Sequence, residues 1–114
     1  MSFSELSKKE ILDLVEPMMD NCLQGSNEDD HAKHVRDFTD RLKNIVTPEN
    51  LEAQLAYRPR GFFTDREFVS LFRKKDSIGV VWRQFISTTK DEFVNHAIFV
   101  ESEKSILIDH CLIC

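Results

Sequence analysis

Two histidines, His31 and His34, are three residues apart in an acidic part of the chain. Side chains at this spacing are neighbours on a helix, so the two imidazoles could bind one metal ion if Glu28, Asp30 or Asp37 supplied a third ligand. Two exposed histidines in a solvated turn are the more ordinary explanation of this pattern. We therefore predict no metal site here, and no cofactor.

Two of the three cysteines, Cys111 and Cys114, are separated by two residues. In redox proteins this spacing is combined with a helix N-terminus that lowers the pKa of a thiol, whereas these residues continue a strand pattern. On a strand the two thiols would point to opposite faces. The last four residues also have the spacing of a prenylation box, but no polybasic segment precedes them. We predict that the cysteines are packed as small apolar side chains.

Three polar residues, Gln84, Asn95 and His110, interrupt apolar segments in the last third of the chain. Apolar walls with a few convergent polar groups are typical of a small-molecule pocket. We predict that Trp82 stacks on a bound ligand and that the three polar side chains orient it. The alternative is that these polar groups hydrogen-bond to each other or to a buried water. The predicted lining consists of Trp82, Gln84, Asn95, Phe99 and His110 from the strands, and Met18 and Phe38 from the helices.

The polar residues are predicted to lie on three strands, over residues 78–87, 92–101 and 105–113. β-Branched and aromatic residues dominate these segments, apolar and polar side chains alternate, and short polar turns separate them. Such short connections make antiparallel hairpins, so the three strands should form a meander.

The register of the meander decides which residues share a face. Symmetric turns would place Gln84 opposite Asn95, and Ala97 opposite His110. His110 would then be the only titratable residue on the pocket face, because Asp109 alternates to the other face. A slip of one residue in either hairpin would exchange the two faces.

The first half of the chain has the pattern of helices. A capping box over residues 7–10 begins a helix whose apolar face is Ile11, Leu14, Val15, Met18 and Cys22. Pro17 is predicted to kink this helix or to start a second segment, and Gly25 to close it in a left-handed conformation. A second helix should bury Val35, Phe38, Leu42 and Ile45. A third should begin at Thr47 and Pro48 and carry Leu51 and Leu55.

Residues 64–74 fit two patterns. A capping-box spacing over 64–67 is followed by Phe68, Leu71 and Phe72 at helical spacing. The same residues also alternate as they would in a strand. We predict a helix, because the cap and the spacing agree.

Helices followed by an antiparallel sheet make an α+β order, with the N-terminal helices packed on a curved sheet. The length of 114 residues predicts a single domain over residues 1–114. Fifteen Lys and Arg against 20 Asp and Glu give a net charge of −5, which disfavours nucleic acid as a partner. With no membrane-spanning apolar run and no signal-peptide pattern, we predict a cytoplasmic protein without a membrane partner.

Both faces of the predicted sheet are apolar, which is unusual for an antiparallel sheet with one side in water. The helices can cover one face, and we predict that a second copy of the chain covers the other, as a homodimer. The alternative is that segment 56–63 folds across it. Arg83, His96 and Asp109 are predicted on this second face, where Arg83 opposite His96 could fix the register of the dimer.

The order of a helical pair, a short capped helix and a terminal meander resembles the nuclear-transport-factor-2-like superfamily. This cone-shaped, cystatin-like α+β fold includes ketosteroid isomerase, scytalone dehydratase and SnoaL-like polyketide cyclases. Residues 34–39 (HVRDFT) and 47–51 (TPENL) resemble those of bacterial members. The resemblance implies a pocket between the helices and the concave sheet, and often a dimer through the sheet. Its enzymes place an Asp or a His inside the cone as the general base.

Three functions are compatible with this sequence. We predict a small-molecule-binding protein with an apolar pocket, whose ligand is small and at least partly apolar. The first alternative is an isomerase, dehydratase or cyclase with His110 as the acid or base, because an ordinary histidine titrates in a suitable range. The second alternative is a dimeric interaction module with a filled core. The sequence has no complete catalytic signature, so enzyme activity is left open.

Overall fold

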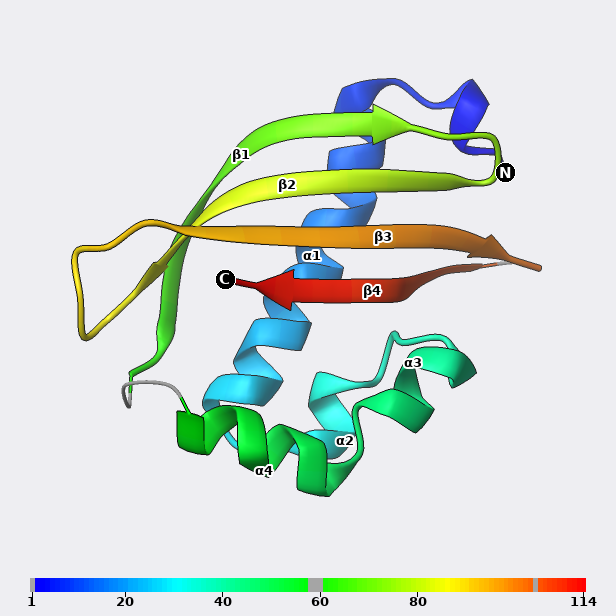
Figure 1. Ribbon diagram of the computed structural model, residues 1–114. Helices are drawn as coiled ribbons and strands as arrows, with labels where there is room; N and C mark the ends of the chain where they lie inside the picture. The colour runs from blue at the N-terminus through cyan, green and yellow to red at the C-terminus, as the bar shows by residue number, and fades with distance from the viewer. Residues whose placement is uncertain (1, 58–60, 104) are drawn as a thin grey trace.

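The computed structural model describes residues 2–57, 61–103 and 105–114. Helices come first: the 3-10 turn η1 (Phe3–Glu5), the long helix α1 (Lys8–Asn27), α2 (His31–His34), α3 (Asp40–Ile45) and α4 (Pro48–Tyr57). The strands of the described chain follow: β1 (Phe63–Arg73), β2 (Ser77–Ile86), β3 (Phe93–Ser102) and β4 (Ser105–Ile113). They form one open antiparallel sheet in the order β1-β2-β3-β4 (Figure 1). The predicted α+β class is confirmed.

The core lies between α1 and one face of the sheet. In Figure 1, α1 passes behind the strands, α2, α3 and α4 lie beyond β4, and β1 and β2 bend at one end toward α4. Ile11, Val15 and Met19 of α1 are buried in one cluster with Trp82 and Phe99 of the strands. We call the sheet face against α1 the inner face and the opposite one the outer face.

Helix α1 begins as predicted, with a capping box in which Ser7 and Glu10 satisfy each other's backbone amides. The predicted end at Gly25 is wrong. The helix continues through Pro17 and Gly25 to Asn27, and the left-handed residue after it is Asp29, with φ 53°. Gly25 is needed for close packing, because a Cβ there would lie 2.4 Å from the backbone nitrogen of His34.

The predicted second helix is divided into α2 and α3. Between them the chain runs along β4, where the Thr39 amide donates to the Ile108 carbonyl (2.9 Å) and the Ile108 amide to the Asp37 carbonyl (2.7 Å). This pairing uses backbone groups of β4 that a continuous helix would leave open at the edge of the sheet. Val35 and Leu42 are buried as predicted, but Ile45 is 53% exposed.

The helix predicted over residues 64–74 is wrong, because this segment forms β1. It pairs with β2 along most of its length, with Phe68 opposite Trp82. Two register shifts interrupt the pairing, between Phe63 and Arg66 and between Phe68 and Ser70. The segment forms a strand rather than a helix because the backbone of β2 offers a row of hydrogen-bonding partners that an isolated helix does not use.

The sheet register differs from the symmetric one. Trp82 lies opposite Asn95, a shift of two residues that leaves both residues on the inner face. Between β3 and β4 a bulge leaves Asp109 as the extra residue, because Ile98 pairs with His110 and Phe99 pairs with Ile108. The prediction that His110 lies on the pocket face is therefore wrong. It lies on the outer face.

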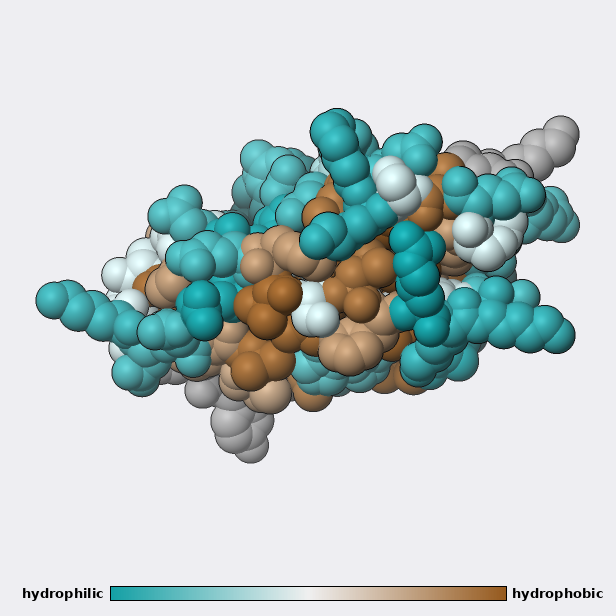
Figure 2. Space-filling view, turned by 90° about the horizontal axis from the view of Figure 1, so that it is seen from above, coloured by the Kyte–Doolittle hydropathy of each residue, from teal (hydrophilic) through white to brown (hydrophobic). Residues whose placement is uncertain are grey.

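The outer face is apolar and partly exposed. Phe72, Val94 and Leu112 are 54%, 48% and 50% exposed. Figure 2 views the molecule from above, edge-on to the sheet, and shows hydrophobic surface between hydrophilic side chains on that side as well. The described ends of segment 56–63 lie beside α1 rather than across this face, and residues 58–60 are outside the described chain. Among the described residues no helix combines the length and the apolar character needed to cross a bilayer.

Candidate functional site

The polar residues predicted to orient a ligand are buried in the core. Gln84 and Asn95 have no exposed surface. The Gln84 amide donates to the carbonyls of Asp65 (3.2 Å) and Phe85 (3.1 Å), and the Asn95 amide donates to Gln84 Oε1 (3.2 Å). These bonds match the alternative in which the polar groups satisfy each other. Asn95 Oδ1 has no partner among the described residues.

The remaining predicted pocket residues are distributed over the core and its margins. Trp82 and Phe99 are fully buried and meet edge to face, with ring centroids 6.3 Å apart. Phe38 is buried in the same core, and Met18 packs against it while partly exposed. None of the seven predicted lining residues lies on the wall of either cavity described for this chain.

An ion pair that the sequence did not indicate closes the core beside Trp82. The Arg66 side chain, 9% exposed, bonds Glu16 and Asp20 of α1, and its guanidinium lies 5.3 Å from the centre of the Trp82 ring. Glu16 also accepts a hydrogen bond from the Trp82 indole (3.1 Å). The sequence does not reveal this pairing, because the helix that it predicts over residues 64–74 would not align Arg66 with Trp82.

A cavity of about 600 Å³ opens where the end of α1, helix α4 and the bent ends of β1 and β2 meet. Its apolar wall consists of Leu55, Ala56, Phe62, Phe63 and Ile86. Its polar lining consists of Ser26, Asn27, Asp29, Glu52, Ser87 and Thr88. These residues come from four separate segments, so no local sequence pattern could have grouped them.

Two of the polar lining residues hold the wall together. The Asn27 side chain bonds both backbone groups of Phe63, each at 2.9 Å, and so fixes the first residue of β1 to the end of α1. The Ser87 hydroxyl accepts from the Phe62 amide (2.9 Å). Ser26 differs, because its hydroxyl is buried without a hydrogen-bond partner among the described residues.

The outer face carries a second polar feature, the pair His96 and His110. His96 Nδ1 and His110 Nε2 are 3.1 Å apart. Burial lowers the pKa of His110, and the charges of His96 and Arg41 lower it further. The hydroxyl of Thr39 holds the pKa of Asp109 below its usual value by donating to it, and Arg41 contributes in the same direction.

The cluster predicted from Arg83, His96 and Asp109 does not form. Arg83 lies opposite Val94, not His96, and its guanidinium bonds Glu67 (3.2 Å) and Glu92 (2.6 Å). Asp109 instead bonds Thr39 (2.7 Å) and Arg41 (3.0 Å) at the start of α3.

The two histidines that could have bound a metal ion, His31 and His34, bond backbone carbonyls instead. His31 bonds the Val46 carbonyl (2.8 Å), and His34 bonds the Cys22 carbonyl (2.7 Å). The described part of the chain brings no three His, Cys, Asp or Glu side chains together in a way that could hold a metal ion. Cys111 points inward toward Cys22, whose pKa is raised by a hydrogen bond between the two thiols and by burial.

Comparisons with known proteins add no relative to this picture. The chain matches no family model, no curated protein and no solved structure.

Proposed function

We propose that this protein binds a small, partly apolar molecule in the cavity between α1, α4 and the bent ends of β1 and β2. The observation that carries the proposal is the combination of volume and lining. A cavity of about 600 Å³ is within the range of ~300–1,000 Å³ that small-molecule sites occupy. Its wall is apolar on the α4 and β1 sides, and the Asp29, Glu52, Ser87 and Thr88 side chains provide polar groups on the rest of the lining.

The charges around the cavity restrict the ligand. Asp29 and Glu52 both lie on its lining, and no Lys or Arg belongs to the described lining. An anionic molecule would meet two carboxylates in a chain whose net charge is −5. The two carboxylates of the described lining favour a neutral or cationic ligand, with an apolar part that packs against Leu55 and Phe62.

The proposal is tested with a neutral, solvent-sensitive dye such as Nile red. Ala56→Trp places an indole at the cavity wall from an exposed position of α4, whereas Ala53→Trp adds the same ring on the same helix at an exposed position outside the lining. We expect the wild type and Ala53→Trp to enhance and blue-shift the dye emission equally. Ala56→Trp should reduce the affinity by at least tenfold at unchanged thermal stability.

Equal dye binding by all three proteins would show that the dye does not enter this cavity. Absence of dye binding by the wild type, together with no small molecule retained in native mass spectrometry, would contradict the proposal as a whole.

We also propose that two copies of the chain pair through their outer sheet faces. Four strands about 4.8 Å apart and about ten residues long, at ~3.3 Å per residue, give a face of about 600 Å² in projection. Side chains raise the accessible area above this projection, toward the ~800 Å² per partner of a stable interface. Phe72, Val94 and Leu112 are exposed on this face, and a second copy is the partner that supplies a matching apolar surface.

A relationship to the nuclear-transport-factor-2-like superfamily is a further proposal, supported by the order of helices and meander. The described sheet is open, so a closed cone is not part of it. Acid–base catalysis by His110 is not supported by its position, because His110 lies on the outer face and the cavity lies on the α1 side.

A further inference from the structure

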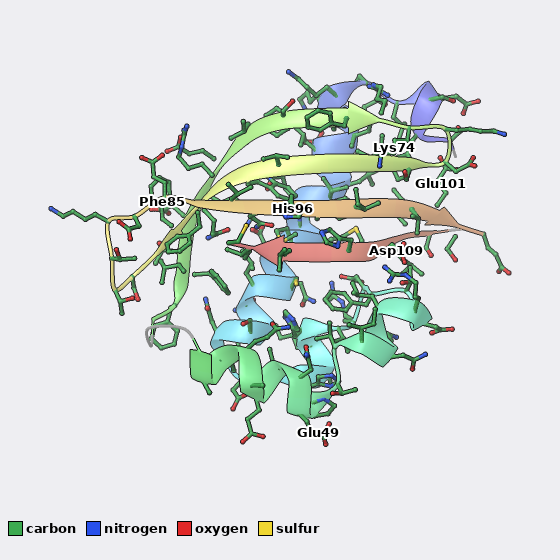
Figure 3. The ribbon with its side chains drawn as sticks, in the orientation of Figure 1. Glu49, Lys74, Phe85, His96, Glu101 and Asp109 are labelled. Carbon is green, nitrogen blue, oxygen red and sulfur yellow. The ribbon has the colours of Figure 1, made fainter. Side chains whose placement is uncertain are left out.

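The two imidazoles of His96 and His110 face each other across neighbouring strands of the outer face. Their ring centroids are 4.9 Å apart and the ring planes differ by 33°. The Asp109 bulge creates this pair, because without the extra residue His110 would point to the inner face. His96 lies near the middle of β3, with Asp109 on the adjacent strand (Figure 3). Both histidines are partly exposed.

The separation of the two nitrogens suits a shared metal ion. For bonds of ~2.05 Å, nitrogens 3.1 Å apart subtend an angle of ~98° at the metal, between the ~90° of square-planar and the ~109° of tetrahedral coordination. An ion there would replace the hydrogen that the two nitrogens share. His96 Nδ1 and His110 Nε2 would both present lone pairs, and the histidine that donates the shared hydrogen would carry its ring proton on its other nitrogen instead.

The charges around the pair do not exclude a cation. A metal ion binds the neutral form of an imidazole. The Asp109 carboxylate is an adjacent negative charge that favours a cation. The Arg41 guanidinium has the opposite effect, but it is ion-paired with that carboxylate at 3.0 Å.

Two ligands from one chain do not complete a metal site, and the described residues supply no third ligand nearby. A second copy docked on this face would supply two more imidazoles. In a two-fold symmetric interface the residues beside the axis lie close to their own copies. A shared site therefore places the axis beside the β3–β4 side of the face, where the pair lies. We propose that the dimer binds one zinc ion between the two His96–His110 pairs, one pair from each copy. This inference rests on the sheet-face dimer proposed above.

The test uses the full chain and Zn²⁺ alone. Zinc binding is measured by calorimetry and molecular mass by light scattering, each for the protein stripped with EDTA and then loaded. His96→Gln and His110→Gln each remove one ligand, and His31→Gln is the control with the outer-face pair intact. We expect one zinc per two chains in the wild type and in His31→Gln. Each outer-face variant should lose at least the ~10–100-fold in affinity that loss of an outer-shell partner costs.

The outcomes separate this inference from the dimer itself. A dimer that persists in EDTA and binds no zinc would overturn the zinc site and leave the dimer proposal standing. Zinc affinity that is equal in the wild type and both outer-face variants would overturn it as well. One zinc per monomeric chain would contradict a shared site, and a monomer under both conditions would contradict the site and the dimer together.

Discussion

His110 shows how one inserted residue decides what a side chain can do. In a regular meander it would face α1 beside Ala97, whereas the bulge at Asp109 places it on the outer face against His96. No sequence pattern marks this bulge, because Asp109 is bound by Thr39 and Arg41, about 70 residues earlier in the chain. The sequence predicts which residues of β2 and β3 share a face, but it does not predict the face on which His110 of β4 lies.

The position of His110 makes the stability of the protein depend on pH. Burial and the neighbouring His96 and Arg41 lower its pKa in the folded state. Between this lowered value and the ordinary ~6.5, the unfolded chain binds more protons than the folded one, so the free energy of unfolding falls as the pH is lowered. We expect the urea midpoint to fall from pH 7 to pH 5 in EDTA, and to fall less in His110→Gln.

The control for this experiment is His31→Gln, which leaves the outer-face pair in place and should keep the wild-type pH dependence. If His110→Gln lost stability as steeply as the wild type over the same interval, the contribution assigned to His110 would be wrong.

Buried polar residues illustrate what the sequence could not decide. Gln84 and Asn95 were predicted on the inner face, and they are there, but the sequence does not distinguish a ligand-binding amide from one bonded to its neighbour. That distinction depends on whether empty space lies beside them. The space is elsewhere, beside Ser26, which no motif marks because its wall is assembled from segments far apart in the chain.

At the scale of elements, capping residues predicted a helix start correctly where their side chains bond backbone amides of the same helix. The capping box at Ser7 and the cap at Thr47 form as predicted, because these hydroxyls satisfy amides within one turn. The capping-box spacing at the start of residues 64–74 does not form a helix, because pairing with β2 offers backbone hydrogen bonds along the whole segment. Caps predict helix starts only where no strand competes for the same residues.

The hydroxyls of the two capping threonines make different numbers of hydrogen bonds. Thr39 accepts from the Leu42 amide at the start of α3 (3.2 Å) and also donates to Asp109 on β4 (2.7 Å), so it links the helix to the sheet bulge. Thr47 accepts from the Asn50 amide (3.1 Å) at the start of α4. Thr47→Ala should lower the free energy of unfolding by about 1 kcal/mol, as a cap alone does. Thr39→Ala should cost about 2.5–4 kcal/mol, because a hydrogen bond to a charged group, worth about 1.5–3 kcal/mol, is lost together with the cap.

Urea unfolding followed by the fluorescence of Trp82, the only tryptophan in the sequence, measures both variants in one assay. Equal losses for Thr39→Ala and Thr47→Ala would show that the bond to Asp109 contributes nothing to stability.

At the scale of the whole molecule, the helices are unevenly distributed over the sheet. α1 covers the inner face, and α2, α3 and α4 lie beyond the β4 edge (Figure 1). No described helix covers the outer face, although several of its side chains are apolar. Both apolar faces could be predicted from the alternation of the strands, whereas the position of the helices could not, because it depends on how α2 and α3 are held at β4.

The outer-face dimer is tested by a pair of variants matched in exposure. Leu112 on the outer face is 50% exposed, and Ile45 on α3 is 53% exposed. Leu112→Glu would place one carboxylate from each copy in the apolar part of a symmetric interface, where burial of an unpaired charge is unfavourable. We expect light scattering in EDTA to give twice the 13.3 kDa chain mass for the wild type and Ile45→Glu, and the single-chain mass for Leu112→Glu. Because both substitutions add the same charge at a half-exposed leucine-sized position, a dimer that survives in Leu112→Glu and dissociates in Ile45→Glu would locate the interface on α3 instead.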